Sequence, residues 1–322
     1  MSKKEFYYPS SDGINNIHAF RWDPEGEPVA VLQIVHGMTE FVGRYSDFAS
    51  FLAEHGFLVV GEDHLGHGGS VSKEEDYGYF GPDGNRHMIR NIHRLRVQTQ
   101  VENPDIPYFI LGHSMGSFLV RQYITEQNGH FAEDLAGAII VGTGHQSAPT
   151  LAAGKTVAKL ISKIKGERAR SPFIEGLAFD KYQSRIENPR TEKDWLTRDE
   201  KVVDWYVNEE WCQFTFSVNA YYNMFKGIEK AHDKKRMKAL PAGFPILFAS
   251  GTEDPVGNWG EGVRKTWELY DKNSSCHLDL KLYDGMRHEI INEIGKEEVY
   301  DDILTWMQEV IDEQHVSKRV QE

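Results

Sequence analysis

A serine between two glycines is the feature of this sequence that best fits a catalytic role. Gly112, Ser114 and Gly116 give the pattern GxSxG within GHSMG, in which small flanking residues let a strand turn sharply into a helix and expose the serine. The preceding YFIL has the character of a buried strand, and the following SFLVRQYI has helical periodicity. This context predicts that Ser114 is a nucleophile, against the alternative of a glycine-rich turn with an incidental serine. His113 is expected to pack beside the serine or support the site, not to act as its base.

A serine hydroxyl is a poor nucleophile at neutral pH, so it needs an imidazole to take its proton and a carboxylate to orient that imidazole. Two loops late in the chain supply both groups in the order serine, acid, histidine that this motif requires. Asp254 follows the apolar run PILFASG, and His288 follows LKLYDGMR. Because the carboxyl ends of parallel strands open onto one crevice, we predict that Asp254 and His288 complete a catalytic triad with Ser114.

Each of these two residues also has a structural interpretation when taken singly. Asp254 precedes a proline and would suit a turn, and His288 would suit the start of a helix. Their positions after the last two expected strands favour catalysis. Glu253 remains a minor alternative to Asp254, whereas Asp284 and His277 flank the final strand in unsuitable places.

The oxyanion of a tetrahedral intermediate needs hydrogen-bond donors that are already in place. In this arrangement they are the N–H after the nucleophile and an N–H from a loop after an early strand. These positions correspond to Met115 and to Met38, which lies in the loop HGMTE. Gly37 permits the backbone turn that would aim the Met38 N–H inward. The alternative for this loop is an ordinary turn between strand and helix.

Eight short runs rich in apolar or β-forming residues indicate the strands of one sheet. The first two flank the turn Ser10-Ser11-Asp12-Gly13 and predict a hairpin at one edge. The others alternate with helical periodicity, which predicts a doubly wound, mostly parallel α/β sheet flanked by helices. The eight runs are residues 5–10, 15–22, 29–37, 57–63, 108–114, 135–143, 245–251 and 278–284.

The interval from residue 145 to 240 breaks this alternation, since it holds charged helical stretches and no clear strand. This is expected of an insertion between two strands of one sheet. The stretch from Ser171 to Phe225 contains 12 aromatic residues in 55, more than a thin solvated excursion should carry. We therefore expect residues 1–144 and 241–322 to form the core domain, and residues 145–240 to form a helical cap whose aromatic side chains line a pocket.

Charge and cysteine content restrict the partners and the compartment. With 36 basic and 49 acidic residues the net charge is −13, which opposes binding to polyanions, so no nucleic acid partner is expected. Cys212 and Cys276 show no CxxC spacing and do not form the disulfide framework of a secreted domain. No signal-peptide core and no run of about 18 uncharged apolar residues is seen. We expect a cytoplasmic protein without a membrane span, and no obligate protein partner is evident.

A histidine- and glycine-rich stretch, DHLGHGGS at 63–70, does not indicate a metal or phosphate site. It lacks the companion ligands of a zinc site, and neither HExxH nor GxxxxGK[ST] occurs in the chain. We expect no metal and no cofactor. The basic run from Lys155 to Arg170 is interpreted as a solvated face of the cap, which leaves a transient contact with anionic lipid headgroups open.

Five motifs resemble the bacterial lysophospholipase and monoacylglycerol lipase-like hydrolases, a branch of the α/β-hydrolase superfamily often grouped with serine aminopeptidases. They are HGMTEFVGRY, DHLGHGGS, GHSMG, GTEDPVG and RHEIINE, and the cap segment NPRTEKDWLTRDEKVVDWY is also similar. The resemblance implies the α/β-hydrolase fold and a metal-free hydrolase of glycerol-linked or similar acyl esters. It assigns the triad to Ser114, Asp254 and His288 and an oxyanion N–H to Met38. Phe41 departs from the pattern, since a histidine is common there.

Three functions remain open at this level. The first is a carboxylic ester hydrolase that cleaves monoacylglycerol or lysophospholipid-type esters through an acyl-enzyme, with an apolar pocket for a medium or long acyl chain. The second is a peptidase that releases N-terminal residues, which would need an acidic site for the substrate's amino group. The third is a non-catalytic binding protein on the same fold, against which the ordered triad argues.

Overall fold

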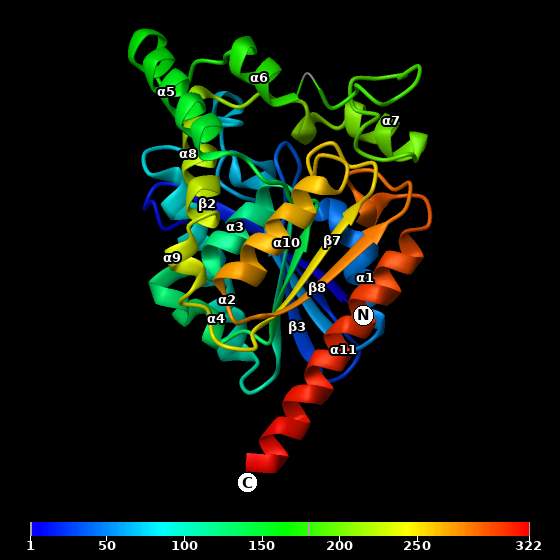
Figure 1. Cartoon of the computed structure of the whole chain (residues 1–322). Coiled ribbons are helices and arrows are strands. Elements are labelled where there is room, and N and C mark those ends of the chain that lie inside the picture. The colour runs from blue at the N-terminus through cyan, green and yellow to red at the C-terminus, as the bar shows by residue number, and fades with distance from the viewer. Residues whose placement is uncertain (1, 180, 322) are drawn as a thin grey trace.

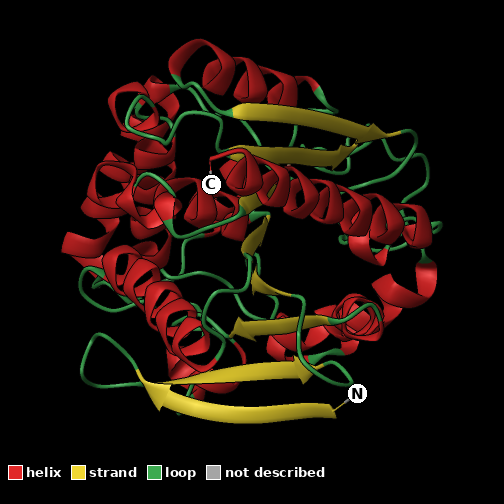
Figure 2. Cartoon of the chain, turned by 90° about the horizontal axis from the view of Figure 1, so that it is seen from below, coloured by secondary structure: helices red, strands yellow, loops and turns green. Residues whose placement is uncertain are grey.

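The expected strands form a single eight-stranded sheet in the computed structural model, which describes residues 2–179 and 181–321 (Figures 1 and 2). They are β1 (Ser2–Pro9), β2 (Asn16–Asp23), β3 (Ala30–Val35), β4 (Phe57–Glu62), β5 (Tyr108–His113), β6 (Gly137–Val141), β7 (Pro245–Gly251) and β8 (His277–Tyr283). Their order is β1-β2-β4-β3-β5-β6-β7-β8. The pairs β1·β2 and β2·β4 are antiparallel, and the remaining pairs are parallel. The predicted mostly parallel sheet and its edge hairpin are confirmed.

Helices cover both faces of this sheet, which explains why its central strands are apolar throughout. In β5, Tyr108 and Ile110 join the hydrophobic cluster on one face, and Phe109 and Leu111 join the cluster on the other. The first face is covered by α2 (Gly84–Glu102), α3 (Met115–Tyr123) and α10 (Glu261–Asn273). The second is covered by α1 (Ser46–Glu54) and α11 (Lys296–Gln321) (Figures 1 and 2). A short helix, α4 (His130–Glu133), precedes β6.

The chain between β6 and β7 is helical and, among the residues that the structure describes, contains none of the eight strands. It forms α5 (Ala148–Lys165), α6 (Pro172–Phe179), α7 (Glu200–Asn208), α8 (Val218–Ala231) and α9 (Lys234–Met237). The helices α5, α6 and α7 lie above the carboxyl ends of the parallel strands, whereas α8 descends beside α3 (Figure 1). The division into a core and a cap ending at residue 240 remains a prediction.

Side-chain caps mark where α5, α7 and α8 begin. Ser147 Oγ accepts a hydrogen bond from the Thr150 N–H at the start of α5, and Ser217 Oγ accepts from the Ala220 N–H at the start of α8. Asp199 accepts from a backbone N–H at the start of α7. Such caps satisfy N–H groups that have no partner within the helix. Within the described ranges, no helix is both long and apolar enough to cross a bilayer.

Candidate active site

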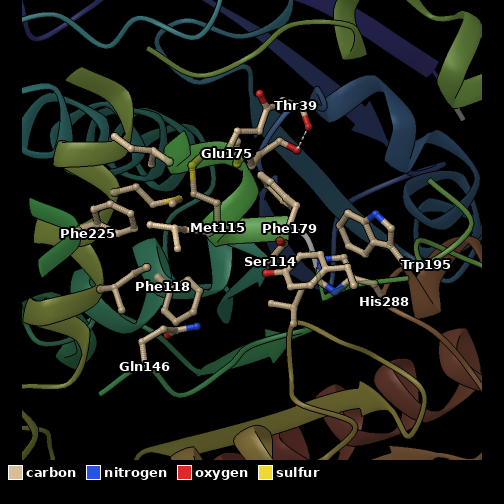
Figure 3. A pocket seen from close by; sticks show the side chains of 18 of the residues that line it. Thr39, Ser114, Met115, Phe118, Gln146, Glu175, Phe179, Trp195, Phe225 and His288 are labelled. Carbon is tan, nitrogen blue, oxygen red and sulfur yellow. Dashed lines mark hydrogen bonds between the residues drawn. The ribbon is translucent and has the colours of Figure 1, made fainter. Parts of the chain in front are cut away.

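Ser114 occupies the sharp turn between β5 and α3, as the GxSxG pattern predicts. Its backbone angles are φ 52° and ψ −119°, a region that residues other than glycine rarely adopt. The Ser114 N–H donates to the Val141 carbonyl on β6 at 3.0 Å, and this bond fixes the turn against the neighbouring strand. The serine lines a pocket whose wall includes residues of the interval between β6 and β7 (Figure 3). Its hydroxyl is therefore presented at the carboxyl end of the sheet.

The two glycines of the motif are required by close packing rather than by their backbone angles. A Cβ on Gly112 would lie 2.3 Å from the Gly116 carbonyl oxygen, and a Cβ on Gly116 would lie 1.9 Å from the Val35 carbonyl oxygen. Both distances are far below van der Waals contact, and in each case the obstructing atom is backbone that cannot rotate away. The helix α3 can thus approach the end of β3 only because position 116 has no side chain.

Asp254 and His288 lie next to each other although 34 residues separate them in sequence. Asp254 Oδ1 is 2.9 Å from His288 Nδ1, and both side chains are almost fully buried. The carboxylate also accepts hydrogen bonds from the Ser250 hydroxyl at 3.0 Å and from the Val256 N–H at 2.9 Å. Burial alone would raise the pKa of Asp254, but His288 and these two donors lower it below its usual value. A charged carboxylate therefore faces one nitrogen of the imidazole and leaves the other for the pocket.

The competing residues take no part in this pair. Glu253, the minor alternative, is exposed, and its N–H donates to the Met286 carbonyl. Asp284 accepts a long hydrogen bond from Thr252 at the surface. His277 starts β8, at the opposite end of the strand from His288, and its side chain is 64% exposed.

Ser114 and His288 line the same pocket, together with Met38 and Met115 (Figure 3). Space for the imidazole is provided by Gly142, a residue that was not predicted to belong to the site. Gly142 has a φ of 59°, and a Cβ there would lie 3.0 Å from His288 Cε1. A glycine directly after an apolar strand run was the one available signal. The structure thus brings together the residues predicted to act as nucleophile, base and acid, and their catalytic roles remain a prediction.

The loop predicted to supply an oxyanion N–H approaches the nucleophile closely. A Cβ on Gly37 would lie 2.9 Å from Ser114 Cβ, so only glycine lets the loop come this near. Met115 is the first residue of α3, and the N–H groups of a helix's first turn have no acceptor within the helix. The N–H groups of Met38 and Met115 belong to backbone that borders the pocket beside Ser114. This placement is compatible with their predicted role as oxyanion donors.

Beneath this loop lies a buried ionic network that sequence reasoning missed. Glu40 accepts hydrogen bonds from the Gly37 N–H and from His113 Nδ1, the latter at 3.0 Å. It also pairs with Arg44 at 3.0 Å, and Arg44 forms two parallel hydrogen bonds of 2.8 and 2.7 Å with Glu289. Glu289 directly follows His288, so the network connects the loop of the oxyanion donor to the loop of the base. The only sequence signal for this network is the presence of charged residues in the motifs HGMTEFVGRY and RHEIINE.

The histidine-rich stretch is packed as a structural cluster. His64 donates its backbone N–H to His36 Nε2 at 2.9 Å, and the two rings stack 4.1 Å apart. Burial lowers the pKa of His67 to about 3, with a further contribution from His64. The His67 side chain is therefore a neutral imidazole packed in the core. In the portion of the chain that the structure describes, no group of three His, Cys, Asp or Glu side chains is placed to hold a metal ion.

The pocket above Ser114 has a volume of about 650 Å³. Its apolar wall comes from α3 and from the interval between β6 and β7. The residues of this wall include Phe118, Leu151, Val157, Ile174, Met224, Phe225 and Ile228. In Figure 3, Phe118 and Phe225 lie on one side of Ser114, and Trp195 and His288 lie on the other. The aromatic residues of the predicted cap do contribute to this wall.

Comparison with known proteins gives three consistent results. The family model described as "Serine aminopeptidase, S33" matches residues 26–295. A monoacylglycerol lipase of Mycolicibacterium smegmatis is 27% identical over 292 residues, which cover 89% of this chain and 90% of that protein. A phospholipase of Bacillus subtilis is 25% identical over 286 residues, which cover 85% of this chain and 93% of that protein.

A solved structure resembles the whole chain. The crystal structure of a highly thermostable carboxyl esterase from Bacillus coagulans, in complex with glycerol, superposes with a TM-score of 0.88. The two sequences are 29% identical, and the match covers 97% of this chain and 99% of that chain.

Proposed function

The chain belongs to the serine aminopeptidase S33 family of α/β-hydrolases, and from this premise we propose that it is a carboxylic ester hydrolase that acts through an acyl-enzyme on Ser114. The observation that carries this proposal is the 2.9 Å pair of Asp254 and His288, which sets the imidazole in the pocket that Ser114 lines. The names of the relatives, a monoacylglycerol lipase, a phospholipase and a carboxyl esterase, support the same reaction class.

The reaction begins when His288 takes the proton of the Ser114 hydroxyl as the oxygen attacks the acyl carbonyl. Asp254 holds the imidazole in the required tautomer and stabilises the imidazolium that forms. The N–H groups of Met38 and Met115 donate to the carbonyl oxygen as it becomes negatively charged. When the intermediate collapses, His288 gives its proton to the departing alcohol. Water then enters and gives a proton to the same imidazole as it attacks the acyl-enzyme, and His288 returns that proton to the Ser114 oxygen as the acid leaves.

The substrates that fit the pocket are esters of glycerol with one acyl chain, either monoacylglycerols or lysophospholipid-type compounds. The wall formed by Phe118, Leu151 and Phe225 is apolar, so it favours the burial of a hydrocarbon chain by about 25 cal/mol per Å². The volume of about 650 Å³ lies within the usual range for a small-molecule site. A medium or long acyl chain therefore belongs on this side of Ser114.

A substrate panel tests this proposal. Purified protein is assayed on p-nitrophenyl esters of graded chain length, a monoacylglycerol, a lysophospholipid and an aminoacyl anilide. We expect turnover of the esters with little of the anilide, and a loss of several orders of magnitude in kcat for Ser114→Ala with binding retained. Full ester turnover by Ser114→Ala, or turnover of the anilide alone, would show that the proposal is wrong.

The proposal also includes a cap over residues 145–240 that contacts lipid surfaces. Large apolar side chains of α5 and α6 are exposed, namely Leu160, Ile164, Phe173 and Leu177. Phe173 and Leu177 also line the pocket, and exposed lysines lie in the C-terminal part of α5, between Lys159 and Lys165. This combination suits a transient contact with an anionic membrane surface. Sedimentation with phosphatidylglycerol vesicles should exceed that with phosphatidylcholine vesicles and fall with added salt.

A cytoplasmic location is the last part of the proposal. Cys212 and Cys276 are both free thiols, the first buried and the second partly so. Free thiols suit a reducing compartment.

A further inference from the structure

Lys193 is a charged side chain in the wall of the substrate pocket that the proposed mechanism does not use. Its Nζ lies 5.9 Å from the centroid of the Phe179 ring, and both residues line the pocket. Lys193 follows α6 and precedes α7, so it belongs to the stretch from Ser171 to Phe225 that is rich in aromatic residues. Burial lowers the pKa of Lys193, whereas Glu175 and Glu192 act to raise it. The ammonium has thus lost part of its hydration.

Among residues 2–179 and 181–321, no carboxylate lies within 4.0 Å of the Lys193 ammonium. The described residues therefore give this ammonium no close counter-ion. Glu175 also lines the pocket, yet its Oε1 is 3.4 Å from the Thr215 hydroxyl and makes no ion pair with Lys193. A partly desolvated cation that has no carboxylate within ion-pair distance among the residues the structure describes is stabilised by an anion that reaches it from the pocket.

The position of Lys193 assigns it to the alcohol portion of an ester substrate. His288 must give its proton to the departing alcohol, so the alcohol leaves on the side of the imidazole. The Trp195 ring lies 5.2 Å from the His288 ring, and the Phe179 ring lies 6.3 Å from Trp195. The Lys193 Nζ lies near the Phe179 ring, and Lys193 is two residues from Trp195. These contacts assign Lys193 to the imidazole side of the pocket.

The opposite side of Ser114 is suited to the acyl chain. Figure 3 places Phe118 and Phe225 there, away from His288 and Trp195. An ester bound across Ser114 would then extend its hydrocarbon chain toward the phenylalanines and its alcohol toward the segment that carries Lys193. A charged group on the alcohol would meet the ammonium, and a charged group on the acyl chain would not.

We propose that Lys193 binds an anionic phosphate on the alcohol portion of the ester, so that acyl glycerophosphates are cleaved more efficiently than neutral acylglycerols of the same chain length. In such a substrate the phosphate is carried by the glycerol carbon remote from the acyl group. A lysine ammonium is a compact point charge well suited to phosphate oxygens. This inference rests on the proposed function and specifies the substrate class of the same site.

The test compares two soluble substrates with one acyl chain, 1-octanoylglycerol and 1-octanoylglycerol 3-phosphate, below their aggregation concentrations. We expect the native protein to show a kcat/KM for the phosphate ester about tenfold higher, a difference in the range of one charge-assisted hydrogen bond. Lys193→Met should abolish this preference by lowering kcat/KM for the phosphate ester alone. Lys193→Arg should retain it, and so should Lys201→Met, which removes an exposed lysine of α7.

The two hypotheses fail in distinguishable ways. p-Nitrophenyl butyrate, which has no phosphate, reports the ester hydrolysis itself and should be cleaved at the native rate by the control variant Lys201→Met. If the native protein does not prefer the phosphate ester, or if Lys193→Met still prefers it, the role of Lys193 is overturned while ester hydrolysis stands. An equal fall for both octanoyl substrates in Lys193→Met would also overturn it. Absence of turnover on p-nitrophenyl butyrate by the native protein would instead contradict the proposed function.

Discussion

Glu40 and His113 form a buried ion pair, with Glu40 Oε1 3.0 Å from His113 Nδ1, directly beneath the turn that carries the candidate oxyanion donor. The same carboxylate oxygen accepts the Gly37 N–H, and His113 Nε2 lies 3.3 Å from the carbonyl oxygen of His288. One pair of side chains therefore connects the loop before Met38 to the loop of the base. If both loops must hold their geometry during the reaction, this pair is a positioning element for both.

The first prediction concerns the stability that this pair contributes. Burial would raise the pKa of Glu40, but His113, Arg44 and the Gly37 N–H together lower it from 4.5 to about 2. Glu40→Gln leaves the neighbouring cations without their shared carboxylate. Near neutral pH it should lower the free energy of unfolding by roughly 3 kcal/mol, the cost of breaking a buried ion pair. Urea denaturation followed by circular dichroism measures the difference.

The pH dependence of that difference has a definite sign. Because the folded-state pKa of Glu40 is lowered, its contribution is present above the ordinary value of 4.5 and is lost as the pH falls toward about 2. The pKa of His113 is raised by Glu40 despite its burial, so its contribution is present below the ordinary value of 6.5 and is lost as the pH rises through the folded-state pKa. The difference in the free energy of unfolding between the native protein and Glu40→Gln should therefore decrease as the pH is lowered from about 5 to about 3. A gap that stays constant over this range would contradict the assignment.

The second prediction separates Asp254 from its neighbour. Asp254→Asn keeps the shape of the side chain but removes the charge that stabilises the imidazolium, so kcat should fall by roughly 10³ to 10⁴ with KM little changed. Glu253→Gln is the matched control, since this side chain is exposed and lies next in sequence. It should retain full activity. Equal losses in the two variants would assign the effect to the loop and not to the carboxylate.

The third prediction addresses the close approach of α3 to the end of β3 at Gly116. Gly116→Ala would place a Cβ 1.9 Å from the Val35 carbonyl oxygen, which forces α3 away from β3 and should destabilise the fold by more than about 3 kcal/mol. Gly13→Ala is the contrast, because no atom lies within 4 Å of its Cβ and only a φ of 74° opposes the change. It should cost roughly 1 kcal/mol. Thermal unfolding of both variants measures the two effects. Similar melting temperatures for Gly116→Ala and Gly13→Ala would show that close packing does not require a glycine at position 116.

The parts of the structure that the sequence predicts are those set by local pattern. Apolar runs such as residues 57–63 mark strands buried on both faces, and the GxSxG turn locates Ser114 because its strand and helix adjoin it. Asp254 and His288 follow from strand order in a parallel sheet. None of these inferences needs knowledge of distant contacts beyond the rule that strand ends meet at one edge.

What the sequence does not predict depends on contacts between remote segments. Arg44 and Glu289 are 245 residues apart and form two hydrogen bonds, and no periodicity indicates such a pair. The close contact of Gly142 with the His288 ring and the location of Lys193 in the pocket wall likewise arise only when the loops converge. The packing of α8 against α3 is another contact between remote segments.

The fourth prediction tests the central claim most directly through the reactivity of Ser114 toward a fluorophosphonate probe. Only a hydroxyl activated by a neighbouring imidazole reacts rapidly with such a probe. Mass spectrometry of the digested, labelled protein should locate the adduct on Ser114, with labelling abolished in Ser114→Ala and slowed by orders of magnitude in a folded His288→Ala variant. An adduct on another serine that tracks the loss of activity, or labelling of Ser114 that proceeds at the native rate without His288, would contradict the account.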